Sequence, residues 1–168
     1  MSAGASPVAA RRGPRYSVLA ALYFSQGLPT GFFVQALPVL MRERGIDLAA
    51  IGAASLLGAP WALKFLWAPW VDAHGSPAFG RRRTFIVPAQ ALTILLLLGT
   101  ALLDPGRFLP WILALVFVAN TVSATQDVAT DGLAVDMLAP EERGVGNGIQ
   151  VGAHRIGMIV GGGFLLLV

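Results

Sequence analysis

Long apolar runs, separated by short charged or proline- and glycine-bearing connections, organise the whole chain. Each run reaches the ~20 residues that a helix needs to cross ~30 Å of hydrocarbon at ~1.5 Å per residue. The apolar positions are continuous, as in LTILLLLGTALL, whereas the strands of a membrane barrel alternate apolar and polar positions. The pattern therefore predicts an all-α membrane protein with about five transmembrane helices, at residues 16–41, 48–71, 84–103, 109–138 and 145–168.

The composition agrees with a membrane protein. Hydrophobic residues make up 55% of the 168 residues and charged residues only 12%, and the mean hydropathy is +0.69. These values lie outside the usual range of soluble globular domains. Cysteine is absent, which excludes disulfides and thiolate metal sites. We expect neither a metal nor a cofactor.

Arginines are unevenly distributed between the two sides of the predicted helices. Seven lie on one side, namely Arg11, Arg12, Arg15, Arg81, Arg82, Arg83 and Arg143, and three on the other, namely Arg42, Arg44 and Arg107. Because cytoplasmic loops carry the excess of basic residues, we predict a cytoplasmic amino terminus with residues 1–15 as a basic tail. The net charge of +3 reflects this bias, so we do not expect nucleic acid as a partner.

Three aspartates lie within the fourth apolar run, in TQDVATDGLAVDML at residues 125–138. At 100° per residue, Asp127 and Asp131 share one polar stripe with Asn120, whereas Asp136 points to nearly the opposite face. The helical rise places Asp127 ~16 Å and Asp131 ~10 Å from the cytoplasmic helix end. A charge at such depth is expected to face a bundle interior or an aqueous cavity and to have a partner.

The fifth run offers that partner in Arg155, at a depth similar to that of Asp127. The two charges either lock two helices together or belong to a transport pathway, and we favour the pathway. In the second run, Lys64 either snorkels toward the cytoplasmic interface beside an aromatic belt or faces the cavity as a cation for an anionic substrate. The candidate substrate contacts are Gln26, Gln35, Lys64, Asn120, Gln126, Asn147, Gln150 and His154.

Glycines recur every four residues along the fifth run, a spacing that lets helix backbones approach closely. We predict close packing at Gly144, Gly148, Gly152, Gly157 and Gly161.

In the first run, Gly27 and Pro29 predict a kink.

The connection VDAHGSPAFGRRRT places Asp72 at a cytoplasmic helix end and three arginines, Arg81 to Arg83, shortly after it. Asp136, off the polar stripe at the same membrane face, suits these arginines as a partner. This connection resembles the loop between helices 2 and 3 of the major facilitator superfamily. The resemblance implies a network of Asp72, Arg81, Arg82, Arg83 and Asp136 that stabilises one conformation.

A narrower resemblance rests on five segments: KFLWAPWVD (64–72), FGRRR (79–83), TQDVATDGLAVDML (125–138), PEERGVG (140–146) and RIGMIVGGG (155–163). Together they resemble AmpG-type permeases, which import cell-wall muropeptides, and the related acetyl-CoA transporters. The resemblance implies a proton-driven importer of the bacterial inner membrane, of which this chain supplies part of the amino-terminal half. The implied partners are the lipid bilayer, a muropeptide-like solute, protons and the missing carboxy-terminal half. Asp127 and Asp131 would then be protonatable groups of the central cavity, with Arg155 as their countercharge.

Other functions remain open on the sequence alone. An acetyl-CoA or other solute transporter of the same superfamily fits the same motifs. The spacing D-x3-D-x4-D is not far from the aspartate motifs of magnesium-dependent intramembrane transferases, although we find no second acidic cluster. Because the fifth run ends at GGGFLLLV without a closing loop, an inactive truncated product is a further alternative.

Overall fold

The computed structural model describes residues 12–163, and this part of the chain consists of helices joined by short loops. The helical segments are α2 (Arg12–Gly31), η1 (Phe32–Ala36), α3 (Leu37–Glu43), α4 (Leu48–Ala54), η2 (Ser55–Gly58), α5 (Ala59–Leu63), η3 (Lys64–Leu66), α6 (Ala68–Ala73), α7 (Arg83–Ala101), α8 (Pro105–Met137), η4 (Pro140–Glu142), α9 (Arg143–Met158) and η5 (Ile159–Gly163). Most of the predicted basic tail, residues 1–11, lies outside the described residues.

Four helices are long and apolar enough to cross a membrane, which confirms the prediction of an all-α membrane bundle. They are Gly13–Glu43, Leu48–Leu66, Arg83–Ala101 and Gly106–Met137. The described part of the predicted fifth helix, α9 with η5, is not among these four spans. Its polar residues lower its apolarity, and the apolar residues 164–168 lie outside the described part of the chain.

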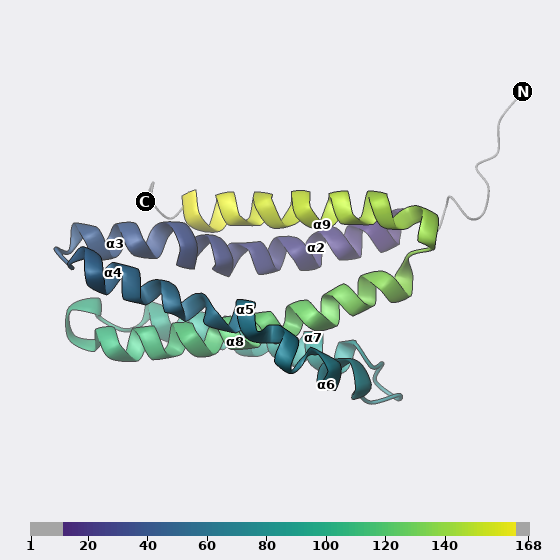
Figure 1. Cartoon of the computed structure of the whole chain (residues 1–168), viewed down its shortest axis with the longest axis horizontal. Helices are drawn as coiled ribbons and strands as arrows, with labels where there is room; N and C mark the ends of the chain where they lie inside the picture. The colour runs from purple at the N-terminus through teal and green to yellow at the C-terminus, as the bar shows by residue number, and fades with distance from the viewer. Residues whose placement is uncertain (1–11, 164–168) are drawn as a thin grey trace, which may run out of the picture.

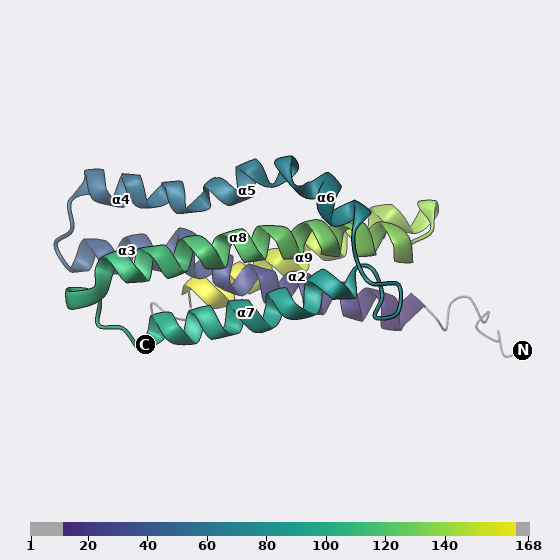
Figure 2. The same cartoon turned by 90° about the horizontal axis from the view of Figure 1, so that it is seen from below.

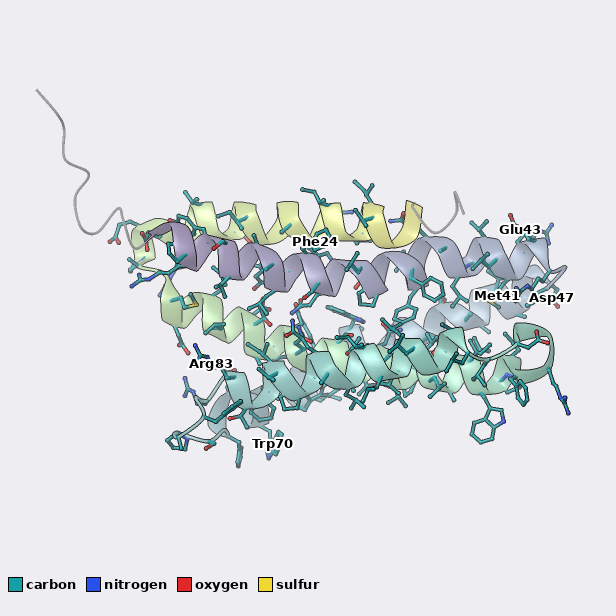
Figure 3. All side chains as sticks on the ribbon, turned by 180° about the vertical axis from the view of Figure 1, so that it is seen from behind. Phe24, Met41, Glu43, Asp47, Trp70 and Arg83 are labelled. Carbon is teal, nitrogen blue, oxygen red and sulfur yellow. The ribbon has the colours of Figure 1, made fainter. Side chains whose placement is uncertain are left out.

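The long helices run side by side along one axis. Helix α9 lies along α2, α7 lies along α8, and the series α4–α6 crosses the bundle beside α8 (Figures 1 and 2). Glu43 and Asp47 lie at one end of the bundle, whereas Trp70 and Arg83 lie at the other (Figure 3). Successive connections therefore alternate between the two ends, as expected when each long helix crosses the same membrane.

Helices α2 and α9 touch backbone to backbone because of glycines. A Cβ built on Gly157 would lie 2.3 Å from the carbonyl oxygen of Phe24, and one built on Gly161 would lie 2.0 Å from that of Leu28. The predicted close packing is therefore confirmed for Gly157 and Gly161. It stays a prediction for three glycines whose Cβ positions meet no atom of residues 12–163 within 4 Å, namely Gly144, Gly148 and Gly152.

Two of the membrane-crossing segments are irregular. Helix α2 continues into α3 through the π-helical segment η1, and Pro29 lies inside α2 just before it. The second crossing is broken into three α-helical pieces by two short 3-10 segments, and Lys64 is the first residue of the second of these, η3. Pro60 and Pro69 stand in the first turns of the pieces that flank it, where proline lacks the amide donor of a continuous helix. These breaks set the direction in which Lys64 leaves the helix.

The middle of α8 is buried although it is polar. Val116 and Ala124 are fully buried, as expected for a central helix, but so are several hydrogen-bonding side chains. The buried polar residues of α8 are Asn120, Ser123, Gln126, Asp127 and Thr130. Since buried polar groups are costly unless they find partners, this band of α8 is where the functional residues are expected.

Candidate functional site

Asp127 is the central acid of the buried polar band, with only 7% of its surface exposed. Its Oδ2 atom forms an ion pair and a hydrogen bond with the Lys64 ammonium group. The same ammonium group lies 3.9 Å from Oδ2 of Asp131, one helical turn further along α8. We name these three residues the embedded charge cluster. Lys64 therefore faces the bundle interior, and the alternative that it snorkels toward the interface is wrong.

Asp131 is held by two further donors from two other helices. The Tyr23 hydroxyl donates a hydrogen bond of 2.7 Å to Oδ1 of Asp131, and Nε2 of Gln150 donates one of 2.9 Å to the same oxygen. Tyr23 is almost fully buried, at 2% exposure. Tyr23 is not among the contacts predicted from the sequence, although it lies three residues before the predicted contact Gln26 and hence on the same helix face.

Arg155 is not the partner of either acid. The described structure contains no ion pair of Arg155 within 4.0 Å, whereas Lys64 approaches both aspartates. The glycines of α9 fix its register against α2, and this register leaves Arg155 exposed at the wall of a cleft rather than against α8. Lys64 reaches the acids from the opposite side, so the predicted pairing of Asp127 with Arg155 is corrected to a pairing with Lys64.

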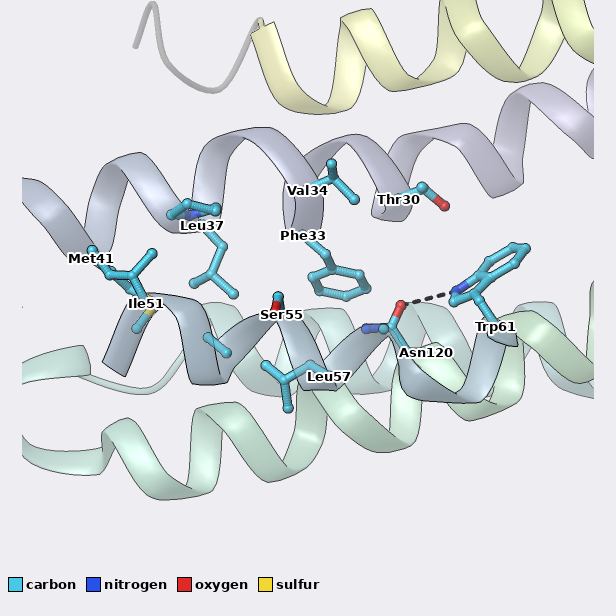
Figure 4. A pocket seen from close by; sticks show the side chains of 13 residues that line it. Thr30, Phe33, Val34, Leu37, Met41, Ile51, Ser55, Leu57, Trp61 and Asn120 are labelled. Carbon is cyan, nitrogen blue, oxygen red and sulfur yellow. Dashed lines mark hydrogen bonds between the residues drawn. The ribbon is translucent and has the colours of Figure 1, made fainter. Parts of the chain in front are cut away.

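An aromatic residue connects the cluster to the cleft. The Trp61 indole N–H donates a 3.3 Å hydrogen bond to Oδ1 of Asn120 (Figure 4). The Lys64 Nζ atom lies 5.7 Å from the centre of the Trp61 ring, within the range of a cation–π contact. The ring of His154 stands edge-to-face to Trp61 at 6.5 Å. Trp61 was not among the predicted contacts, because an isolated tryptophan in an apolar run equally suits lipid.

Two clefts meet at Trp61. The first, of about 420 Å³, is lined by Tyr23, Trp61, Asp127, Gln150, Val151, His154, Arg155 and Met158. The second, of about 360 Å³, lies between α2–α3 and the broken second crossing (Figure 4) and is mostly apolar, with Thr30, Ser55, Trp61 and Asn120 as its polar residues. We name the first of these the Arg155 cleft. The Arg155 cleft therefore contains an acidic side chain, Asp127, a basic side chain, Arg155, and the aromatic ring of Trp61.

The other predicted contacts are distributed more widely. Gln26 is buried and donates a 3.0 Å hydrogen bond to the hydroxyl of Thr130, so it joins α2 to α8. Gln126 is buried in α8 at 3% exposure. Gln35 is exposed on η1 beside Gly162. Asn147 is exposed on α9 and does not line either of the two clefts.

A second group of charges lies at the end of the bundle that carries the loop between α6 and α7. Arg82 donates hydrogen bonds to Asp72 and, at 3.1 Å, to Oδ2 of Asp136. Arg81 approaches Asp136 at 3.5 Å. We name these four residues the loop charge cluster. Among the described residues, Arg83 forms no ion pair within 4.0 Å.

The guanidinium group of Arg82 is the centre of this cluster. Burial lowers its pKa, but the hydrogen bonds to Asp72 and Asp136 and their negative charges raise it more, so the net shift of the Arg82 pKa is upward. Arg82 therefore stays charged at every physiological pH. The loop between α6 and α7, which leads to Arg82, turns at Gly80, whose φ of 97° is in the left-handed region that favours glycine.

Comparison with known proteins identifies relatives of this chain. Residues 15–112 match the family model described as "Acetyl-coenzyme A transporter 1". The chain is 40% identical over 153 residues to the "Anhydromuropeptide permease" of Escherichia coli strain K12, a match that covers 91% of this chain and 31% of the permease. It is 29% identical over 139 residues to the "Putative transporter AmpG 4" of Rickettsia felis, covering 81% of this chain and 34% of that relative.

These similarities confirm the resemblance to AmpG-type and acetyl-CoA transporters that the motifs indicate. An uncharacterised protein of Haemophilus influenzae is 34% identical over 143 residues, again with 34% of its length covered. The chain thus spans about a third of the length of these curated relatives.

Proposed function

We propose that this chain, which belongs to the family of the acetyl-coenzyme A transporters, forms part of a multi-pass, proton-coupled importer of muropeptide-like solutes. The name of the Escherichia coli relative, an anhydromuropeptide permease, supports the choice of solute. The proposal concerns the full-length protein, because the chain spans about a third of its relatives. The arginine bias supports a cytoplasmic amino terminus, and the bacterial relatives support a location in the bacterial inner membrane.

The observation that carries the proposal is the partly buried ion pair between Lys64 and Asp127, the acid that lines the Arg155 cleft. Intramembrane acids are costly and are retained where they move protons or bind ions. Asp127 depends on the neighbouring Lys64, whereas Asp131 accepts hydrogen bonds from Tyr23 and Gln150. Asp127 is thus the acid whose charge changes most readily with the position of a single side chain.

The proposed cycle follows from this arrangement. When a proton neutralises Asp127, the attraction that holds Lys64 disappears, and Lys64 turns toward Asp131, which already lies 3.9 Å away. Asp127 and Asp131 are one helical turn apart, so this exchange moves the second crossing relative to α8. The 3-10 segment that starts at Lys64 is a place where the helix can yield. Rocking of helix bundles around a central site then exposes it alternately to the two sides.

The loop charge cluster supports the same proposal. Arg82 ties the end of α6 through Asp72 to the end of α8 through Asp136. We propose that it closes one conformation and opens when α6 moves away from α8. Such a device needs two alternative arrangements of the same charges.

Uptake by the full-length protein in proteoliposomes tests the proposal. Labelled anhydromuropeptide is supplied with and without an imposed proton gradient, to wild type, Asp127→Asn and the control Glu43→Gln, an exposed acid at the other end of the bundle. We expect gradient-driven accumulation by wild type and control, and exchange without accumulation by Asp127→Asn. Normal accumulation by Asp127→Asn contradicts proton coupling through this acid. Uptake of acetyl-CoA in place of anhydromuropeptide contradicts the proposed solute.

A further inference from the structure

Arg155 is a charged residue that the proposed cycle leaves without a role. It projects from α9 into the Arg155 cleft and is exposed there. Among residues 12–163, Arg155 forms no ion pair within 4.0 Å. The two nearby acids, Asp127 and Asp131, lie against Lys64 instead. A charge at this depth is expected to have a partner.

The charges around the cleft balance without a ligand. The titratable groups that line the cleft are Tyr23 from α2, Asp127 from α8, and His154 and Arg155 from α9. Lys64 and Asp131 line the neighbouring cleft together with Asp72 and Arg82, and the Lys64 ammonium group lies close to both Asp127 and Asp131. Two carboxylates stand against Lys64 and Arg155, but the negative charges gather at Lys64. The positive charge of Arg155 is therefore directed into open space.

The surroundings of Arg155 suit a solute with an anionic group and a ring-shaped or apolar body. The guanidinium group presents a planar set of donors that matches carboxylate and phosphate oxygens. Gln150 lines the same wall with an amide, and Trp61 and His154 provide an aromatic surface nearby. Met158 completes the cleft with a flexible apolar side chain.

We propose that Arg155 binds the anionic group of the transported solute, while Lys64 remains with the two aspartates. This inference rests on the proposed transport function and adds the charge of the solute to it. An anion on Arg155 leaves one excess negative charge in the cleft. A proton on one of the two aspartates restores neutrality, so binding of the anion and of a proton favour each other.

The experiment measures binding to the purified full-length protein by calorimetry. The ligands are anhydromuropeptide and its neutral amide, in which each carboxylate is blocked. The variants are Arg155→Gln, Arg155→Lys and the control Arg42→Gln, an exposed arginine at the far end of α3. We expect wild type and Arg42→Gln to bind the acid about tenfold or more tightly than the amide. Arg155→Gln is expected to bind both ligands alike, and Arg155→Lys to keep part of the preference.

The outcomes separate this inference from the transport proposal. The inference is overturned if the Arg155→Gln variant still prefers the acid to the amide. It is also overturned if the wild-type protein binds both ligands equally, or binds neither of them. If Arg155 instead pairs with an acid elsewhere in the full-length protein, Arg155→Gln lowers the melting temperature and leaves the preference unchanged, which also overturns it. Loss of the preference in Arg155→Gln, together with normal accumulation by Asp127→Asn, supports the anion site and contradicts the proton coupling.

Discussion

Gly132 provides the space in which the guanidinium group of Arg82 lies: a Cβ built at position 132 would lie 2.2 Å from Cζ of Arg82. Gly132 directly follows Asp131, so the loop charge cluster and the embedded charge cluster are adjacent on α8. A cleft of about 470 Å³ is lined by members of both, including Lys64 and Asp72. A movement of the second crossing that shifts Lys64 therefore also shifts the partner of Arg82.

Replacing Gly132 with alanine is expected to displace the Arg82 guanidinium and weaken its bonds to Asp72 and Asp136. We expect the free energy of unfolding to fall by about 1 kcal/mol, the typical loss of partly exposed hydrogen bonds, and the uptake rate to fall. Gly58→Ala is the control, because its Cβ meets no described atom within 4 Å. The decisive measurement is the double variant with Arg82→Ala. If Gly132→Ala adds its full effect to that of Arg82→Ala, it does not act through Arg82.

Removing one member of the Asp127–Lys64 pair is expected to cost more than removing both. Lys64→Met leaves Asp127 as an uncompensated buried charge, and we expect a loss of about 1–3 kcal/mol, less than for a fully buried pair because Lys64 is partly exposed. In Lys64→Met/Asp127→Asn no charge is left unpaired at this pair, so part of the stability returns. Thermal unfolding of the full-length protein measures the difference. A double variant no more stable than Lys64→Met shows that the ion pair does not govern stability here.

The sequence is sufficient to predict the helices and the buried acids, because each depends on local properties. Continuous apolar runs mark the four membrane-crossing segments, and the 100° spacing places Asp127 and Asp131 together. The partner of Asp127 depends on tertiary packing: Lys64 reaches Asp127 from the second crossing, whereas Arg155 lies on α9, which packs closely against α2. The space at Gly132 likewise depends on a loop that reaches it from another part of the chain.

Tyr23 is expected to position Asp131 through its hydroxyl group alone. Tyr23→Phe keeps the ring in the buried cluster with Leu19 and Leu138 and removes one donor to Asp131. We expect a loss of about 1 kcal/mol in unfolding free energy and a slower uptake. Tyr16→Phe serves as a control, because this tyrosine packs against the same cluster, whereas the tyrosine that donates a hydrogen bond to Asp131 is Tyr23. In the background of Asp131→Asn, the effect of Tyr23→Phe is expected to shrink, and an unchanged effect would show that the hydroxyl acts elsewhere.

Two glycines of α9 are expected to respond to alanine with opposite signs. A Cβ at Gly157 meets the carbonyl oxygen of Phe24 at 2.3 Å and the Cα of Gly27 at 2.9 Å. Since both are backbone atoms, α9 must move away from α2, and we expect Gly157→Ala to destabilise the protein by about 1–3 kcal/mol.

At Gly152 the Cβ meets open space within the described structure, so alanine adds only its better helix propensity, about 1 kcal/mol at most. We therefore expect Gly152→Ala to leave the melting temperature unchanged or to raise it. Thermal unfolding of the two single variants, in the full-length protein, compares the same chemical change on two faces of one helix. If Gly152→Ala destabilises as much as Gly157→Ala, the face with Gly152 packs closely against a part of the full-length protein outside residues 12–163.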